Sequence, residues 1–249
     1  MKKNNLKFLT QKIDSFAFKK GKIVNNQYKI IEKLGGGLEG EVYLVHELTT
    51  GIERAIKFFK PHQNPKNKVA KLYAKKLHKL RHCQIIMQYL CLGKFTYWGR
   101  EIHFIVSELI EGQTLTAFLK NQKGKRLQPL QAVLLLHSLV SGLEDVHASK
   151  EYHGDLHLDN IIVQKFGLGF DLKVLDMFYY GRTNSQDYKD DLHDAIRIFY
   201  DVLGGQKYYK NQPDQIKFIC AGLKKNIISK RFRSMSYLKY HLENLQWVS

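Results

Sequence analysis

The chain has 249 residues, which suits one folded unit with a core divided at most between two lobes and argues against a long repeat array. Its 40 Lys and Arg outnumber its 23 Asp and Glu and give a net charge of +17, which favours anionic partners unless Lys is simply the default surface residue. No basic and aromatic nucleic-acid motif accompanies this charge, so nucleic acid is not an expected partner.

The first part of the chain carries patterns typical of β structure. Residues 1–27 are a basic extension that we expect to dock on the rest of the chain. Its apolar anchors are Leu6, Phe8, Leu9, Ile13, Phe16 and Phe18. From 28 to 47, alternating and β-branched residues on both sides of a glycine cluster predict two strands joined by a loop. Pro65 can open a helix that runs to about Arg81. Further strands are expected over 53–60, 85–92 and 102–109.

The pattern changes near residues 108–112, and from there on most segments have the apolar spacing typical of helices. The segment 129–148 is hydrophobic over most of its circumference, so we expect a buried helix. It ends before HGDLHLDN, a loop over 153–160. The strands and helices expected after this loop cover 161–164, 172–176, 190–203, 214–224 and 235–245.

Cysteine content and hydropathy bear on the compartment. The three cysteines form no CxxC pair, so they indicate neither a zinc site nor a disulfide framework and favour a reducing compartment. The first 16 residues lack the apolar core of a signal peptide, and no stretch of 18 apolar residues occurs. We therefore expect a soluble cytoplasmic protein without a transmembrane segment, and leave export by a non-classical route open.

The glycine cluster has a spacing that suits phosphate binding. LGGGLEGEV contains G-x-G-x-x-G as Gly35, Gly37 and Gly40, and glycines without Cβ let backbone N–H groups approach phosphate oxygens. A Rossmann turn would continue into a helix, whereas strand residues follow here. Lys57 on the next strand is suited to face the α- and β-phosphates, although a lysine that stood alone would be better explained as one solvated lysine among many.

A second group of polar residues follows the buried helix. Asp155 can orient or deprotonate an attacking hydroxyl, and the amide oxygen of Asn160, five residues on, can ligate a metal ion. Sixteen residues later, Asp176 ends a strand and can hold Mg²⁺ against the β- and γ-phosphates. Because Mg²⁺ needs few protein oxygens, one Asp and one Asn suffice.

The glycine loop, AIK, HGDLHLDN and LDMF, in this order and spacing, resemble the signature set of the protein-kinase superfamily. The resemblance implies a bilobal α+β fold that forms one catalytic domain, with a β-rich N-lobe over 28–107 and a hinge and α-helical C-lobe over 108–249. It implies a Ser/Thr protein kinase that uses ATP and Mg²⁺ to transfer the γ-phosphoryl group to a protein substrate, which the basic charge of the chain allows to be acidic.

The resemblance also assigns roles to single residues. The implied catalytic residues are Asp155, Lys57 and Asn160, and the implied metal ligands are Asn160 and Asp176. The implied ATP-binding residues are Gly35, Gly36, Gly37, Gly40, Val42, Ala55, Lys57, Glu108 and Ile110. Ser107 would guard the inner pocket, Asp191 would cap the catalytic loop, and Arg231 resembles a late Arg of the second lobe.

One departure from the family pattern concerns the strand lysine. The family pairs this lysine with a Glu on the first-lobe helix, but no Asp or Glu occurs between Lys57 and Arg100, and Tyr73 stands at the expected position. We therefore expect Lys57 to pair with Asp176 or to be held only by the phosphates of bound ATP, and turnover to be slow.

Two further departures concern the catalytic loop and the segment after it. Gly154 replaces the usual Arg, and His157 stands where Ser/Thr kinases usually carry Lys. Only 14 residues separate Asp176 from Asp191, Phe178 replaces the glycine of D-F-G, and no A-P-E appears. The platform for a substrate peptide is therefore truncated, and the basic first-lobe helix or the N-terminal extension is the expected substitute.

These departures leave two alternatives open. HGDLH is also the form found in aminoglycoside kinases and related small-molecule phosphotransferases, although this chain has no room for the inserted helices that wall off their acceptor pocket. The missing Glu partner of Lys57 fits a nucleotide-binding pseudokinase that works as an interaction module.

Overall fold

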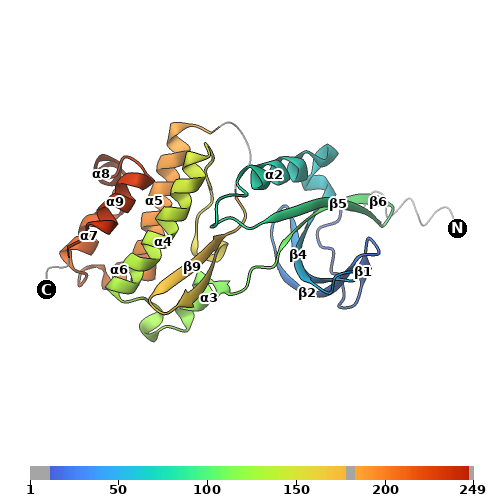
Figure 1. Cartoon of the computed structure of the whole chain (residues 1–249), viewed down its shortest axis with the longest axis horizontal. Helices are drawn as coiled ribbons and strands as arrows, with labels where there is room; N and C mark the ends of the chain where they lie inside the picture. Colours follow the sequence, from blue (N-terminus) through green and yellow to red (C-terminus); the bar gives the residue numbers. More distant parts are fainter. Residues whose placement is uncertain (1–11, 178–182, 247–249) are drawn as a thin grey trace. The chain divides into compact units, whose positions relative to one another are not determined.

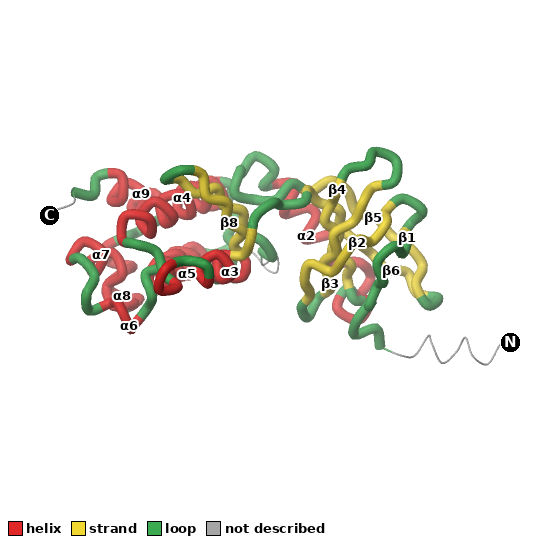
Figure 2. The backbone as a smooth tube through the Cα atoms, turned by 90° about the horizontal axis from the view of Figure 1, so that it is seen from below, coloured by secondary structure: helices red, strands yellow, loops and turns green. Residues whose placement is uncertain are grey.

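The computed structural model describes residues 12–177 and 183–246. The chain forms two compact units, the first made of Met1–Arg81 and Met87–Ile110 and the second of His82–Ile86 and Glu111–Ser249. The first unit holds most of the strands and the second most of the helices (Figures 1 and 2). The predicted α+β class, with a β-rich first part and a helical second part, is confirmed.

The first unit is built on an antiparallel sheet with strand order β1-β2-β3-β4-β6-β5. Its strands are β1 (Ile23–Val24), β2 (Tyr28–Gly36), β3 (Gly40–Glu47), β4 (Glu53–Phe59), β5 (Tyr89–Tyr97) and β6 (Arg100–Glu108). Side chains alternate between the two faces, and directly paired residues share a face. Val42 pairs with Lys57, and Tyr43 with Ile56, so these two pairs lie on opposite faces of the sheet.

The N-terminal extension covers the face that carries Ile56. Its residues Ile13, Phe16 and Phe18 are buried in one cluster with apolar side chains of β2, β3, β4 and β6. Phe18 meets the ring of Phe58 edge to face, with 5.1 Å between ring centroids. The expected docking is therefore confirmed for Ile13, Phe16 and Phe18, whereas the anchors proposed at Leu6, Phe8 and Leu9 lie outside the described residues.

A buried carboxylate fastens this extension to the strand that follows the glycine loop. Glu41 is only 3% exposed and accepts hydrogen bonds from Ser15 Oγ at 2.8 Å and from the Phe16 N–H at 3.2 Å. Lys33 Nζ at 2.6 Å and the Tyr43 hydroxyl at 2.7 Å complete its partners. Burial alone would raise the pKa of Glu41, but these hydrogen bonds lower it to about 2.

The strand predicted over 85–92 is wrong in its first half. β5 begins only at Tyr89, and residues 82–86 belong to the second unit. There the Val174 N–H donates to the Ile85 carbonyl at 2.8 Å, and Ile86 forms a single bridge with Val174. Gly142 permits this arrangement, because a Cβ on it would stand 2.6 Å from Ile85 side-chain atoms.

Helix α2 (Lys68–Lys79) packs on the first unit. Val69, Tyr73 and Leu77 form part of its buried side. Pro65 opens a 3-10 turn over Pro65–Asn67 rather than the α-helix itself, because the backbone there passes through the left-handed region before the regular helix begins. The Asn64 side chain accepts the Ala70 N–H at 3.2 Å and so takes the capping role.

The second unit is mainly helical, with a small sheet of order β7-β8-β9. The strands are β7 (Gln113–Thr114), β8 (Ile161–Phe166) and β9 (Gly169–Val174). The helices are α3 (Leu115–Lys120), α4 (Pro129–Ala148), α5 (Ser185–Val202), α6 (Gln206–Tyr209), α7 (Asp214–Cys220), α8 (Lys225–Arg231) and α9 (Met235–Glu243). None of the helices in the described ranges combines the length and apolar character that a membrane span requires.

Two helix boundaries differ from the prediction for local reasons. Helix α5 starts at Ser185 rather than 190, because Asn184 and Asp187 form a reciprocal capping box. The helix predicted over 214–224 ends at Cys220, where the next residue adopts a positive φ of 48°, and α8 follows as a separate helix. The buried helix predicted over 129–148 is confirmed as α4.

Candidate active site

The loop HGDLHLDN is held by one buried carboxylate on α5. Asp191 is fully buried and accepts the backbone N–H groups of His153 at 2.7 Å and of Gly154 at 2.8 Å. His147 Nε2 at the end of α4 lies 3.0 Å from the same carboxylate. The capping role that the family resemblance implied for Asp191 is confirmed by these contacts.

We expect Asp191→Asn to destabilise the second unit, because the amide would turn an NH2 group toward a backbone N–H that needs an acceptor. The free energy of unfolding should fall by about 2–4 kcal/mol, as expected for a broken buried charged network. Urea unfolding measures it. Asp190→Asn, at a partly exposed neighbouring position on the same helix, is the matched control, and an equal loss in both variants would contradict the cap.

His153 ties the loop to the end of strand β9. Its ring is fully buried, Nδ1 accepts the Asp155 N–H at 3.2 Å, and Nε2 lies 2.9 Å from the Leu175 carbonyl. These partners assign the proton to Nε2, since Nδ1 accepts and a carbonyl oxygen cannot donate. His153 therefore buttresses the loop from a fully buried position.

Asp155 and Asn160 lie together in this loop. Asn160 Nδ2 donates to the Asp155 carbonyl oxygen at 3.0 Å and to its Oδ2 at 3.3 Å, and Asn160 is 8% exposed. The side chain of Asp155 is 61% exposed, so its carboxylate is accessible to a hydroxyl from solvent. Since the amide nitrogen of Asn160 is engaged, its oxygen is the atom left to ligate a metal ion.

Asp176 is brought to the same end of the second unit. The residue before it, Leu175, donates its N–H to the Asn160 carbonyl at 2.8 Å. Asp176 has a positive φ of 53°, a conformation in which Asp is enriched among non-glycine residues. The neighbouring Phe178, predicted to replace the glycine of the D-F-G triplet, lies outside the described residues.

The available ligand atoms fit a divalent cation whose coordination is completed by phosphate oxygens. Asn160 offers an amide oxygen and Asp176 a carboxylate, both hard oxygen ligands of the kind that Mg²⁺ prefers. Within residues 12–177 and 183–246, no group of three or more His, Cys, Asp or Glu side chains forms a metal cage. A metal site here would therefore depend on oxygens from a nucleotide.

The His157 ring lies near Asp155, a position that the sequence pattern did not predict. Its Nδ1 accepts the Asp159 N–H at 3.3 Å, which puts the ring proton on Nε2. Nε2 then faces Asp155 Oδ2 at 3.7 Å. The position that usually carries Lys in Ser/Thr kinases thus still presents a donor toward the candidate catalytic carboxylate.

Lys57 belongs to the first unit, where Glu39, Tyr73 and Phe59 lie near its ammonium. Its Nζ lies 3.5 Å from Glu39 Oε2 and 5.0 Å from the ring centroid of Tyr73. Tyr73, expected at the position of the missing Glu, therefore meets the lysine with an aromatic face. The contact with Glu39 was not predicted, although Glu39 is the acidic residue inside the glycine loop.

The other predicted nucleotide residues of the first unit gather on the same sheet and loop. Val42 pairs with Lys57, and Ala55, two residues before Lys57, shares its face. A Cβ on Gly35 or Gly37 would meet nothing within 4 Å, so their surroundings are open. Gly40 differs, because its Cβ would stand 2.2 Å from the Phe58 carbonyl oxygen, which makes this glycine a packing requirement of the strand pair.

The segment predicted as the hinge is tied to residue 88 by hydrogen bonds. Glu108 donates its N–H to the Gln88 carbonyl at 3.0 Å, and its carboxylate accepts the Gln88 N–H at 2.9 Å. Ser107 is 5% exposed, and its Oγ lies 3.2 Å from the Glu108 carbonyl oxygen. Ile110 is the last residue of the first unit.

Arg231 has partners of its own in the second unit. Its Nη1 donates to the Phe218 carbonyl, and its guanidinium lies 4.1 Å from the Phe218 ring centroid. The structure therefore gathers Asp155, Asn160 and Asp176 in the second unit, while Lys57 and the glycine loop are parts of the first.

The chain resembles known proteins over most of its length. A family model described as the protein kinase domain matches residues 28–221. Serine/threonine-protein kinase PrkC of Bacillus subtilis (strain 168) is 28% identical over 159 residues, which cover 63% of this chain and 23% of PrkC. The protein named probable serine/threonine-protein kinase YbdM of the same bacterium is 27% identical over 215 residues, or 81% of this chain and 80% of YbdM.

Solved structures agree on the fold. The crystal structure of a double mutant of the Mycobacterium tuberculosis PknI kinase domain matches with a TM-score of 0.65 at 16% identity, over 91% of this chain and 98% of that one. This likeness supports the bilobal kinase fold that the sequence predicted. Since the family model covers well over half of the residues, the chain belongs to the protein kinase domain family.

Proposed function

We propose that the chain is an ATP-dependent Ser/Thr protein kinase. Members of its family use ATP and a divalent metal ion, and relatives that it matches are named serine/threonine-protein kinases. The observation that carries the proposal is the loop in which Asp155 and Asn160 are hydrogen-bonded to each other and held by the buried Asp191. A domain that only binds partners has no need of an exposed carboxylate supported in this way.

In the proposed reaction Asp155 orients the substrate hydroxyl and accepts its proton. The hydroxyl oxygen forms a bond to the γ-phosphorus while the bond from that phosphorus to the β,γ-bridging oxygen breaks, and ADP leaves. Asn160 and Asp176 are the proposed ligands of Mg²⁺, which when bound neutralises charge on the phosphates. Lys57 steadies the phosphates, with Val42, Ala55 and the glycine loop around the nucleotide.

The neighbours of Lys57 support slow turnover. Glu39 lies 3.5 Å from the ammonium, so incoming phosphates have to compete with a carboxylate for it. Tyr73 offers no negative charge to position the lysine. This arrangement is also the observation that favours the second candidate, a pseudokinase that binds nucleotide without transferring phosphate.

A small-molecule kinase is the less favoured reading, because the matched relatives are named protein kinases. The net charge of +17 supports an acidic protein substrate. The cysteines Cys83, Cys91 and Cys220 are free thiols, which supports a reducing compartment, and we propose the cytoplasm.

The direct test is a transfer assay with radiolabelled ATP, Mg²⁺ and a panel of acidic and basic protein substrates. We expect label to appear on protein Ser or Thr residues. Label that moves only into low-mass material would contradict the proposal in favour of a small-molecule acceptor. Tight binding of Mg-ATP without any transfer would contradict it in favour of the pseudokinase.

The metal site predicts a separate result for nucleotide binding. Asp176→Ala should weaken Mg-dependent ATP binding, so that the rise in melting temperature produced by Mg-ATP is largely lost. Asp171→Ala, which removes an exposed carboxylate from strand β9, should keep the full rise. If both variants respond to Mg-ATP like the unmodified protein, Asp176 is not a ligand.

A further inference from the structure

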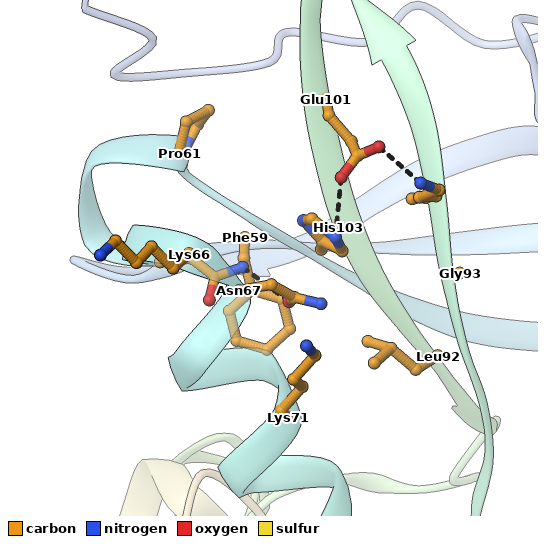
Figure 3. Close-up of a pocket in the computed structure, with 11 residues that line it drawn as sticks. Phe59, Pro61, Lys66, Asn67, Lys71, Leu92, Gly93, Glu101 and His103 are labelled. Atoms are coloured by element: carbon orange, nitrogen blue, oxygen red, sulfur yellow. Dashed lines mark hydrogen bonds and ion pairs between the residues drawn. The ribbon is translucent and has the colours of Figure 1, made fainter.

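The first unit contains a cavity of about 770 Å³ between the start of α2 and the β5-β6 hairpin. Phe59, Lys66 and Lys71 line it from one side, and Leu92, Gly93 and His103 from the other (Figure 3). None of its lining residues belongs to the proposed nucleotide site. The volume lies within the range of about 300–1,000 Å³ that is typical of small-molecule pockets.

The charge of this cavity is positive. Three lysines and one carboxylate, Glu101, line it. Glu101 is already satisfied by Lys94 Nζ at 2.7 Å and lies 3.2 Å from His103 Nε2. Burial lowers the pKa of His103 despite the nearby Glu101, so its ring is neutral at pH 7. The charges of Lys66 and Lys71 are therefore the excess that a ligand would meet.

The side chains around Lys71 are arranged as donors. Figure 3 shows the Lys71 ammonium directed into the space beside Phe59 and Asn67, while Lys66 extends outward at the rim. Asn67 is 9% exposed, and its Oδ1 accepts from Asn64 Nδ2 at 3.2 Å. This bond fixes the Asn67 amide and leaves its Nδ2 group to donate elsewhere. No acidic residue stands in the first turn of α2.

We propose that this cavity binds a small phosphate-bearing molecule. Lys71 and Asn67 Nδ2 would hold the phosphate, Lys66 would close over it from the rim, and the half-buried Leu92 would contact the apolar part of the ligand. An ammonium with an amide donor beside it suits a phosphate oxygen. The site lies outside the proposed catalytic machinery and is additional to it.

The test is calorimetric titration of the full chain with inorganic pyrophosphate, while an excess of a non-hydrolysable ATP analogue with Mg²⁺ fills the nucleotide site. We expect one saturable site. Lys71→Gln should weaken it about tenfold, the loss typical of one charged hydrogen bond to phosphate. Lys75→Gln is the matched control, since Lys75 is exposed one turn further along α2 and does not line the cavity.

Three outcomes would overturn the proposal. The first is that pyrophosphate shows no saturable binding once the nucleotide site is filled, which places its binding at that site. The second is that Lys71→Gln and Lys75→Gln weaken binding equally, which makes it an effect of general surface charge. The third is that Lys71→Gln leaves binding unchanged. Because both lysines are exposed, both variants should keep the unfolding midpoint of the unmodified protein, so a change in affinity reports on the cavity.

Discussion

Replacing Asp155 with Asn should lower phosphoryl transfer by about a hundredfold to ten-thousandfold, the usual contribution of a positioned general base. The amide keeps the size of the carboxylate and can still accept from Asn160 Nδ2, so the loop should stay folded. What it loses is the capacity to take the proton of the hydroxyl. Transfer is measured as label on protein per unit time, and Mg-ATP binding, measured in parallel, should change little.

The control for this result lies in the same loop. Asp159 is exposed, and its backbone N–H donates to His157 Nδ1. Asp159→Asn therefore makes the same change of charge four residues away and should retain transfer. Transfer that persists in Asp155→Asn at the rate of the unmodified protein would remove Asp155 from the proposed mechanism.

The second large effect concerns the stability of the first unit. Glu41→Gln should lower the free energy of unfolding by about 2–3 kcal/mol at pH 7, as a buried carboxylate with a strongly lowered pKa implies. The amide offers one acceptor oxygen where the carboxylate offers two, and it brings an NH2 group toward Ser15, Lys33 or the Phe16 N–H. The N-terminal extension should loosen from the sheet as a result.

The pH dependence of this effect has a defined direction. The pKa of Glu41 is lowered from an ordinary 4.5 to about 2 in the folded state, so its stabilisation is fully present above pH 4.5 and is lost as the pH falls toward 2. Urea unfolding of both proteins should give a difference that shrinks over this range. A difference that stays constant with pH would contradict the prediction, and Glu53→Gln, at an exposed position on β4, should show no such difference.

Local patterns in the sequence predicted much of the fold. Alternation from 28 to 47 gave the glycine hairpin of β2 and β3, and the apolar run 129–148 gave the buried helix α4. Such patterns are readable because strand and helix repeats are set by the backbone itself. The strand predicted over 85–92 was wrong in its first half because a local pattern does not say which core a segment joins. Ile85 and Ile86 are apolar and β-branched, as in a strand, but they pack in the second unit.

For the candidate site too, short motifs predicted the residues, whereas tertiary packing decided some of their partners. The order of the motifs identified the kinase family and named Asp155, Asn160 and Asp176, and the resemblance foresaw that Asp191 would hold the loop. The contact of Glu39 with Lys57 escaped prediction, because a loop acid carries no signal of which cation it meets.

The sequence by itself determined the family, the kinds of secondary structure and the residues suited to phosphoryl transfer, since these depend on backbone periodicity and on short motifs. Only the tertiary structure decided that Glu41 lies buried beneath the N-terminal extension and that Lys71 faces a cavity between a helix and a hairpin. Both facts arise from packing between segments distant along the chain, where burial sets the strength of a charge and its partners.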